Sequence, residues 1–315
     1  MTTSPLRLGI SRCLLGEQVR FDGGHKRNTF LTEVLGRFVE WVPICPEVEA
    51  GLGTPREPMK LAGNPRHPRL ITVDTRQDKT KVLERFSTNR VRELTSRDLS
   101  GFVFKARSPS CGVQAVPVYD RAGGFTRSAV GLFAHQFMER FPFIPIEEED
   151  RLLDTDQRTH FLERVYCYRR WCEFVRSPIT KQGLAHFHAT HKYLLMAHSP
   201  AHSKRMGSLL ARNRRSRPAG IAKRYGIELA NAMRVRPSLA KHTNVLQHLL
   251  GYFRNRLTRT ERVTMQRMVE RYRAGDIPLA IPLTAIKEIA QRLELTYLSE
   301  QVYFEPYPRH LMEYL

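Results

Sequence analysis

Three of the five cysteines follow apolar segments that have the length and composition of buried β-strands. Cys13 lies in ISRCLLG, Cys45 in VPICPEVEAGLG and Cys111 in KARSPSCGV. In an open α/β sheet, ligand sites form where loops leave the carboxyl ends of the strands. Three thiols at three such ends can therefore converge on one point, although they lie 32 and 66 residues apart along the chain.

The number and spacing of these thiols limit the chemistry that they can do. A structural zinc site takes four ligands from paired C-x₂₋₄-C segments, and that spacing is absent. A catalytic cysteine needs one thiol and a base rather than three thiols. Thiolates suit iron–sulfur clusters, and three on a four-iron cluster leave one iron without a protein ligand. Spacing alone leaves a cluster, a zinc site and structural roles open.

The segments around these cysteines alternate between strand-like and helix-like patterns. We expect helices at 29–38, 78–99 and 127–141, between apolar runs that are typical of strands. This alternation predicts a doubly wound α/β domain with a largely parallel sheet over residues 1–148. The expected strands are 6–11, 38–44, 69–74, 101–106 and 115–120.

Residues 149–315 carry helical apolar stripes almost throughout and predict an all-α domain. The remaining cysteines, Cys167 and Cys172, fall in its first helix. Five residues correspond to roughly 140° around a helix axis, so the two thiols do not share a face. We interpret both as packing residues.

Positive charge is concentrated in the second half of the chain. The formal net charge is +20, with +4 on residues 1–150 and +16 on residues 151–315. A segregated, arginine-rich charge favours a polyanion partner, because Lys and Arg that neutralise phosphates release condensed counterions. A basic surface without a specific ligand is the alternative.

Other whole-chain features narrow the class of protein. No run approaches the ~18 apolar residues of a membrane span, and the N-terminus lacks the pattern of a secretory signal. Five scattered cysteines argue against a disulfide scaffold. We therefore expect a cytoplasmic protein with no membrane partner.

The cysteine segments resemble a known family. SRCLLGEQVRFDGGHK, VPICPEVEAGLGTPREP and FKARSPSCG are similar to the signature segments of the TudS-type thiouracil desulfurases, and the match covers most of residues 5–145. The resemblance implies a 4Fe–4S cluster on Cys13, Cys45 and Cys111, with one iron lacking a protein ligand. It places the family's catalytic Glu and Ser on Glu47 and Ser108.

The helical half extends this resemblance. Segments in 160–312, including HKYLLMAHS and YRAGDIPLAIPL, resemble a helical domain of unassigned function that is often fused after the first. The fusion is similar to the RudS-type desulfidases, which remove sulfur from 4-thiouridine in transfer RNA. It implies tRNA or another thiolated RNA as partner and leaves thiolated uracil nucleotides open as substrates.

Residue chemistry and resemblance together suggest one reaction, the conversion of 4-thiouridine to uridine. A soft thiocarbonyl sulfur binds the open iron, Glu47 accepts a proton from water, and hydroxide replaces the sulfur held on that iron. Ser108 donates a hydrogen bond to the ring or relays a proton. We expect the Glu47 carboxylate to have no tight Arg or Lys partner; the alternative is that Glu47 is an N-cap or salt-bridge carboxylate. Arg56 either shapes the pocket or closes a loop.

Candidate RNA contacts lie in the second half. Tyr193 and Tyr225 are candidates for stacking on bases, although aromatic residues at helical spacing usually pack in a core. The basic run ARNRRSRPAGIAKR is the first candidate for contact with the RNA backbone. Its cations are Arg212, Arg214, Arg215, Arg217, Lys223 and Arg224.

Two other functions compete with a tRNA 4-thiouridine desulfidase. One is a desulfurase for small thiouracil compounds, whose basic domain serves another purpose. The other is a non-enzymatic nucleic-acid-binding protein whose cysteines sense oxidants or iron. The segregated charge favours RNA over a small base, and Glu47 and Ser108 beside the cysteines favour an enzyme over a sensor.

Overall fold

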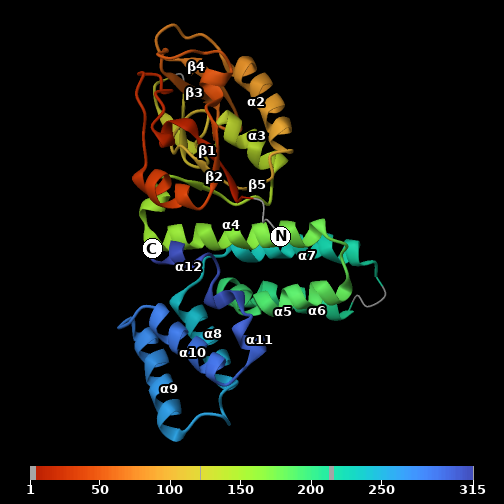
Figure 1. The fold of residues 1–315 in the computed structure, drawn as a ribbon. Helices are drawn as coiled ribbons and strands as arrows, with labels where there is room; N and C mark the ends of the chain where they lie inside the picture. Colours follow the sequence, from red (N-terminus) through yellow and green to blue (C-terminus); the bar gives the residue numbers. More distant parts are fainter. Residues whose placement is uncertain (1–4, 121, 213–215, 315) are drawn as a thin grey trace. The chain divides into compact units, whose positions relative to one another are not determined.

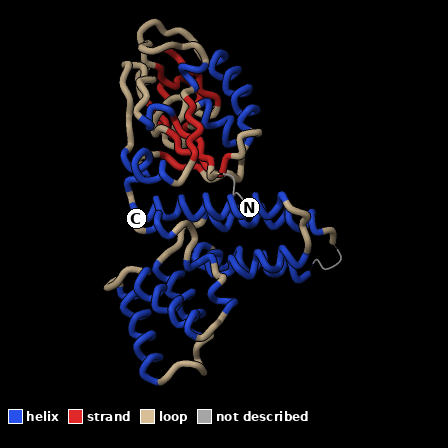
Figure 2. Tube along the Cα trace, viewed as in Figure 1, coloured by secondary structure: helices blue, strands red, loops and turns tan. Residues whose placement is uncertain are grey.

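The computed structural model describes residues 5–120, 122–212 and 216–314. The chain forms two compact units, Met1–Val165 with His310–Leu315 and Tyr166–Arg309. The division falls within helix α4 (Thr155–Arg176). In the described residues, strands occur in the first unit, and the second is helical (Figures 1 and 2). The predicted order, an α/β region followed by a helical region, is confirmed.

A four-stranded parallel sheet organises the first unit. Its order is β2-β1-β5-β8, with every neighbouring pair parallel. The chain moves outward from β1 to β2 and later returns to the other side of β1 with β5, which creates a topological switch point. The strands are β1 (Arg7–Ser11), β2 (Glu40–Ile44), β5 (Leu99–Phe104) and β8 (Ile146–Glu148).

The centre of this sheet is packed through aromatic rings. All six residues of β5 are buried. Phe102 stacks on Phe104, with ring centroids 4.0 Å apart, and meets Phe137 edge-on at 4.9 Å. The adjacent position on β1 is Gly9, where a Cβ atom would come within 2.1 Å of the Phe102 ring. Glycine at this position lets β1 and β5 pair beside a bulky ring.

A second four-stranded sheet departs from the single sheet expected from the sequence. Its order is β4-β3-β6-β7, with β3 and β6 parallel and the two outer pairs antiparallel. Strands β3 and β7 were not predicted, because β3 carries Lys, Gly and Asn and β7 is exposed along most of its length. The strands are β3 (Met59–Asn64), β4 (His67–Thr72), β6 (Val116–Tyr119) and β7 (Phe125–Ala129).

Helices α2 (Thr80–Leu94) and α3 (Leu132–Arg140) pack against each other beside the sheets (Figure 1). Leu83, Val91 and Leu94 recur at helical spacing and form the buried face of α2. The helix expected at 127–141 begins only at Leu132, because the preceding residues belong to β7. The one expected at 29–38 is a π-turn followed by a 3₁₀-turn rather than an α-helix.

The second unit is a helical assembly with its own core. Tyr193, Tyr225 and Phe253 are among its fully buried side chains. No helix in the described residues has both the length and the apolar character needed to cross a membrane. Its main helices are α5 (Lys181–His198), α6 (Pro200–Arg212), α7 (Pro218–Arg234), α8 (Leu239–Gly251), α9 (Arg259–Ala274) and α10 (Ala280–Arg292), and a shorter one is α11 (Thr296–Ser299). Helix α12 (Arg309–Met312) belongs to the first unit from His310 onward.

Candidate active site

The three strand-end cysteines line one cavity. Cys13 lies in the 3₁₀-turn after β1, Cys45 directly follows β2 as the N-cap of the short helix α1 (Pro46–Glu49), and Cys111 lies in the loop after β5. Because β1, β2 and β5 are parallel neighbours, their carboxyl ends share one edge of the sheet. All three residues border a cavity of about 640 Å³ at that edge.

Burial and mutual repulsion oppose ionisation of these thiols. Desolvation is the main cause that raises the pKa of Cys13 to about 12, and the charge of Cys45 raises it further. Burial also raises the pKa of Cys45 and of Cys111, and for Cys111 the charges of both other cysteines add to the effect. Three thiolates here require a cation among them, so the site suits a positively charged metal group.

The donor set fits an iron–sulfur cluster better than one ion. In the described part of the chain, no group of three or more His, Cys, Asp or Glu side chains is arranged to hold a metal ion. Ligands of a single ion must all approach one point to bonding distance. Each cysteine ligand of a four-iron cluster binds a different iron, so the thiols that hold a cluster lie further apart than the ligands of a single ion. Here three cysteines border one cavity, which is the donor type that such a cluster takes.

Glu49 ties the first two cysteine loops together. Its Oε1 accepts hydrogen bonds from the backbone N–H of Cys45 (2.9 Å) and from Arg12 Nη2 (3.1 Å). Its Oε2 forms an ion pair with Arg90 of α2 at 3.2 Å. Arg12 directly precedes Cys13, so one carboxylate fixes the loop after β1 to the loop after β2.

Two carboxylates at the carboxyl end of β8 hold the third cysteine loop. Glu149 Oε2 accepts a hydrogen bond from the backbone N–H of Ala106 at 2.6 Å, and its other oxygen pairs with Lys105. Glu148 Oε1 accepts from the backbone N–H of Val113 at 2.7 Å. Burial raises the pKa of Glu148, and that hydrogen bond opposes the rise. The β5–Cys111 loop is thereby fastened to the end of the neighbouring strand.

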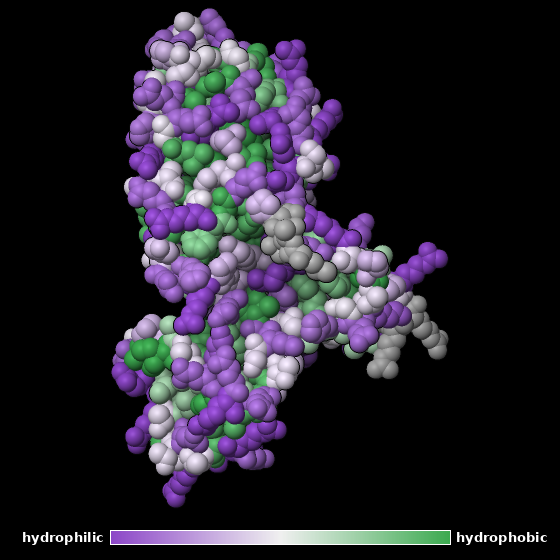
Figure 3. Space-filling view, viewed as in Figure 1, coloured by the Kyte–Doolittle hydropathy of each residue, from purple (hydrophilic) through white to green (hydrophobic). Residues whose placement is uncertain are grey.

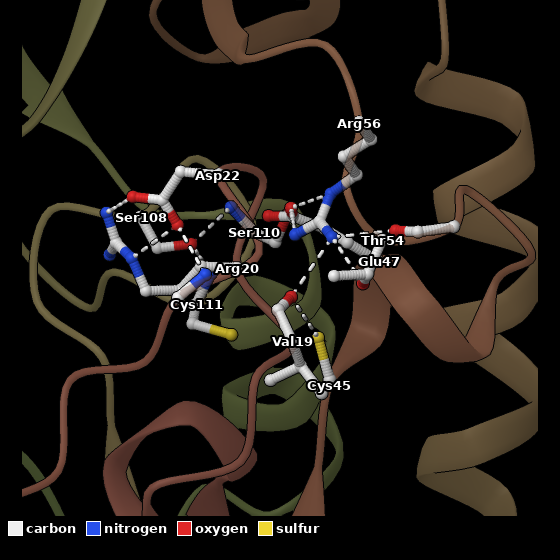
Figure 4. Close-up of polar contacts among 12 residues, drawn as sticks. Val19, Arg20, Asp22, Cys45, Glu47, Thr54, Arg56, Ser108, Ser110 and Cys111 are labelled. Atoms are coloured by element: carbon white, nitrogen blue, oxygen red, sulfur yellow. Dashed lines mark hydrogen bonds and ion pairs between the residues drawn. The ribbon is translucent and has the colours of Figure 1, made fainter.

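Glu47 borders the cavity, but the expectation that its carboxylate lacks a tight cationic partner is wrong. Arg56 Nε donates to Glu47 Oε2 at 2.8 Å, and Arg56 Nη2 donates to the same oxygen (Figure 4). The side chains of Glu47 and Arg56 are only 13% and 8% exposed. A carboxylate that is so well removed from water requires a compensating charge and hydrogen bonds.

Ser110 completes the set of contacts around Glu47. Its hydroxyl donates a 2.6 Å hydrogen bond to Glu47 Oε1, and the residue is fully buried. The sequence pattern predicts Ser108 as the catalytic serine and does not single out Ser110. The signal was present in SPSC, where serines flank the proline, but the pattern does not show which hydroxyl faces the carboxylate.

Ser108 lies in the cavity wall and shapes the Cys111 loop. Its Oγ accepts hydrogen bonds from the backbone N–H groups of Ser110 (3.2 Å) and Cys111 (3.1 Å). These bonds use the lone pairs of the hydroxyl and leave its hydrogen available. Ser108 can therefore orient the cysteine loop and donate a hydrogen bond into the cavity.

The candidate RNA contacts in the second unit have different placements. Arg212 ends α6, Arg217 caps α7, and Lys223 and Arg224 lie on α7; all four side chains are exposed. Arg214 and Arg215 lie outside the described residues. Tyr193 and Tyr225 are 1% and 0% exposed, so the suggestion that they stack on bases is wrong. Both rings pack in the core, where aromatic residues at helical spacing usually lie.

Comparison with family models defines the class of protein. Residues 8–149 match the model described as 2-thiouracil desulfurase, and residues 192–308 match one described as a protein of unknown function, DUF1722. The first domain of this chain is therefore of the 2-thiouracil desulfurase type, and a fused helical domain follows it.

Particular proteins resemble parts of the chain. It is 29% identical to uncharacterized protein YbgA of Escherichia coli (strain K12) over 153 residues, 47% of this chain and 88% of the relative. It is 27% identical to uncharacterized protein YbbK of Bacillus subtilis (strain 168) over 108 residues, 33% of this chain and 71% of the relative. A solved structure of the 4Fe–4S-dependent thiouracil desulfidase TudS is 28% identical, covers 47% of this chain and 93% of its own, and superposes with a TM-score of 0.39.

Proposed function

We propose that the first unit hydrolyses the C–S bond of a thiolated uracil on a 4Fe–4S cluster held by Cys13, Cys45 and Cys111. The observation that carries this proposal is the cavity into which three adjacent parallel strands deliver three thiols beside a carboxylate. A four-iron cluster held by these three cysteines would have one iron without a cysteine ligand. The bound cluster supplies a Lewis acid that favours a soft thiocarbonyl sulfur over water.

Glu47 is the proposed general base. Arg56 and Ser110 hold its two oxygens from opposite sides, so the carboxylate has one orientation (Figure 4). Oε1 accepts one hydrogen bond from Ser110 and keeps capacity for a second from water. Glu47 takes the proton of that water as its oxygen bonds to the ring carbon.

Ser108 is proposed to donate its free hydroxyl hydrogen to a ring oxygen or nitrogen of the substrate. The net reaction is thiocarbonyl plus water to carbonyl plus hydrogen sulfide. Water supplies the oxygen, sulfur leaves with the electron pair of its bond to carbon, and neither element changes oxidation state. The reaction therefore needs no external oxidant or reductant.

Reconstituted protein tests this proposal directly. The full chain, loaded with iron and sulfide under anaerobic conditions, is mixed with 4-thiouracil or 2-thiouracil, and loss of the near-ultraviolet thiocarbonyl band is followed. Cys13→Ala, Cys45→Ala and Cys111→Ala should each lose the brown chromophore and the activity. Cys172→Ala is the matched control and should keep both. Activity in any of the first three variants equal to that of the parent contradicts the proposal.

We further propose that the natural substrate is 4-thiouridine in tRNA and that the protein works in the reducing cytoplasm. The charge segregated on residues 151–315 supports an RNA substrate, and all five cysteines are free thiols. The test compares kcat/KM for 4-thiouracil, a 4-thiouridine nucleotide and thiolated tRNA. A preference for tRNA that shrinks with added salt is expected. Equal values for tRNA and the small compounds favour a small-molecule desulfurase.

A further inference from the structure

The turn between α8 and α9, residues 252–258, presents arginines outward. Phe253 and Leu257 are 0% and 8% exposed and anchor the turn in the core of the second unit. Between these anchors, Arg254 and Arg256 are exposed. Neither arginine side chain makes a hydrogen bond or ion pair with any residue that the structure describes. The turn therefore holds two uncompensated cations on a fixed backbone.

A groove of about 710 Å³ opens beside this turn. Its walls come from α8, the turn and α9, and its volume exceeds that of a nucleotide. Hydrophobic side chains line it together with two guanidiniums, two amides and one carboxylate. The lining includes Leu250, Phe253, Leu257, Met265 and Val269, with Gln247, Arg254, Arg262, Gln266 and Glu270 as the polar members.

An exposed pair of tyrosine rings lies at the same turn. Tyr252, the C-cap of α8, and Tyr297 of α11 have ring centroids 5.7 Å apart and planes inclined by 30°. They are 43% and 37% exposed, and Tyr252 rests edge-on against the buried ring of Tyr193 at 6.5 Å. Core packing thus supports the pair from beneath and leaves ring surface in solvent. Such rings accept unpaired bases by stacking, independently of sequence.

The charge of the second unit decides which partner fits this surface. Residues 166–309 hold 26 Lys or Arg against 9 Asp or Glu, and hydrophilic side chains cover most of this unit in the view of Figure 3. An apolar ligand in the groove would leave the guanidiniums at its edge unpaired. A phosphate backbone pairs with them, and the apolar faces of its bases can stack on the tyrosine rings and pack against the hydrophobic lining of the groove.

We propose that the α8–α9 turn binds a single-stranded segment of RNA, with one base on the Tyr252–Tyr297 pair and an adjoining nucleotide in the groove beside Arg254 and Arg262. This assigns a nucleic-acid site to the domain of unassigned function. It rests on the proposed RNA substrate, and its residues are distinct from those of the basic run at 211–224.

Binding of unmodified oligoribonucleotides to the full-length, cluster-loaded protein tests the site. Fluorescence anisotropy measures the Kd for a labelled twelve-nucleotide oligouridylate and for a twelve-base-pair RNA duplex, each over a range of salt. The variants are Tyr252→Ala/Tyr297→Ala and Arg254→Gln/Arg262→Gln. Tyr252→Phe/Tyr297→Phe keeps the rings, and Arg267→Gln removes an exposed α9 cation that does not line the groove.

The site predicts tighter binding of the single strand than of the duplex. The double alanine variant should weaken single-strand binding about tenfold, whereas the double phenylalanine variant stays within twofold of the parent. The groove variant should lower the slope of log Kd against log salt by about one to two, and Arg267→Gln should change it less. Parent-like binding by the alanine and groove variants, tighter duplex binding, or no binding of either RNA overturns the site.

Activity on free 4-thiouracil separates this inference from the proposed function. All variants of the turn should desulfurate that compound at the parent rate, because the thiol cavity belongs to the first unit. A parent protein that desulfurates 4-thiouracil but ignores both RNAs overturns the RNA site and leaves the desulfidase intact. A parent that binds the single strand but has no desulfidase activity overturns the proposed desulfidase function and leaves the RNA site intact.

Discussion

Ser110 donates a 2.6 Å hydrogen bond to Glu47, a residue 63 positions earlier in the chain. The contact joins α1, the short helix that Cys45 caps, to the loop after β5 that carries Cys111. It assigns Ser110 to the positioning of the proposed base.

Ser110→Ala should lower kcat about tenfold at an unchanged KM, because Glu47 keeps Arg56 but loses the donor that fixes its other oxygen. Cluster content, read from the visible absorbance, should equal that of the parent. Ser110→Thr, which keeps a hydroxyl, should recover part of the loss, and Ser128→Ala on β7 is the neutral control. A fall in cluster content parallel to kcat would assign Ser110 to loop structure alone.

Glu47→Gln should keep the cluster and lower kcat by roughly 10²–10⁴-fold, the usual contribution of a general base. The amide retains an oxygen for Ser110 but cannot accept the proton of water. Absorbance and iron content, measured with the rate, separate chemistry from assembly. Retained turnover would place the base on another residue.

Arg56→Gln should destabilise the first unit by about 3 kcal/mol, because it leaves the buried carboxylate of Glu47 without its cation. Urea unfolding of the apo chain measures the change. The matched control is Arg69→Gln, whose exposed pair with Asp78 at 3.7 Å should contribute little. Equal effects of the two substitutions would contradict the burial argument.

The capping box at the start of α9, formed by Thr258 and Glu261, should make the free energy of unfolding depend on pH in the acid range. Hydrogen bonds from the Thr258 backbone and from Arg292 lower the pKa of Glu261 to about 2, from an ordinary value of 4.5. Because the pKa of Glu261 is lower in the folded state, its contribution to the free energy of unfolding is complete above pH 4.5 and is lost as the pH falls toward 2. The stability difference between the parent and Glu261→Gln, measured by urea unfolding, should therefore shrink over that range. A constant difference would contradict this assignment.

Neutralising the four exposed cations of the basic run should weaken RNA binding with little dependence on sequence. In Arg212→Gln/Arg217→Gln/Lys223→Gln/Arg224→Gln, the salt slope should fall by up to about three to four if each cation contacts a phosphate. The rate on free 4-thiouracil should stay within a few-fold of the parent. Equal losses on RNA and on the small compound would mean that these residues support folding.

The sequence was most informative where local pattern and topology agree. Cys13, Cys45 and Cys111 each follow an apolar run, and parallel neighbouring strands bring such positions to one edge. The second sheet was not predicted, because β7 has four exposed residues and no alternation to reveal it. A strand of that kind is recognised only from its partner.

Side-chain partnerships were less predictable than strand ends. The Arg56–Glu47 pair depends on how the segment between them folds back, which neither residue type encodes. Tyrosines on helices illustrate the same limit. Tyr193 and Tyr225 are buried while Tyr252 and Tyr297 are exposed, although all four lie on helices or at a helix end.

Hydrolysis of 4-thiouracil in ¹⁸O-labelled water tests the central claim most directly. Cluster-loaded protein should form uracil that carries one ¹⁸O atom and release one sulfide for each product, while the apo protein and Cys45→Ala form none. Unlabelled uracil, or equal rates for the loaded and apo proteins, would contradict cluster-dependent hydrolysis at the three-cysteine cavity.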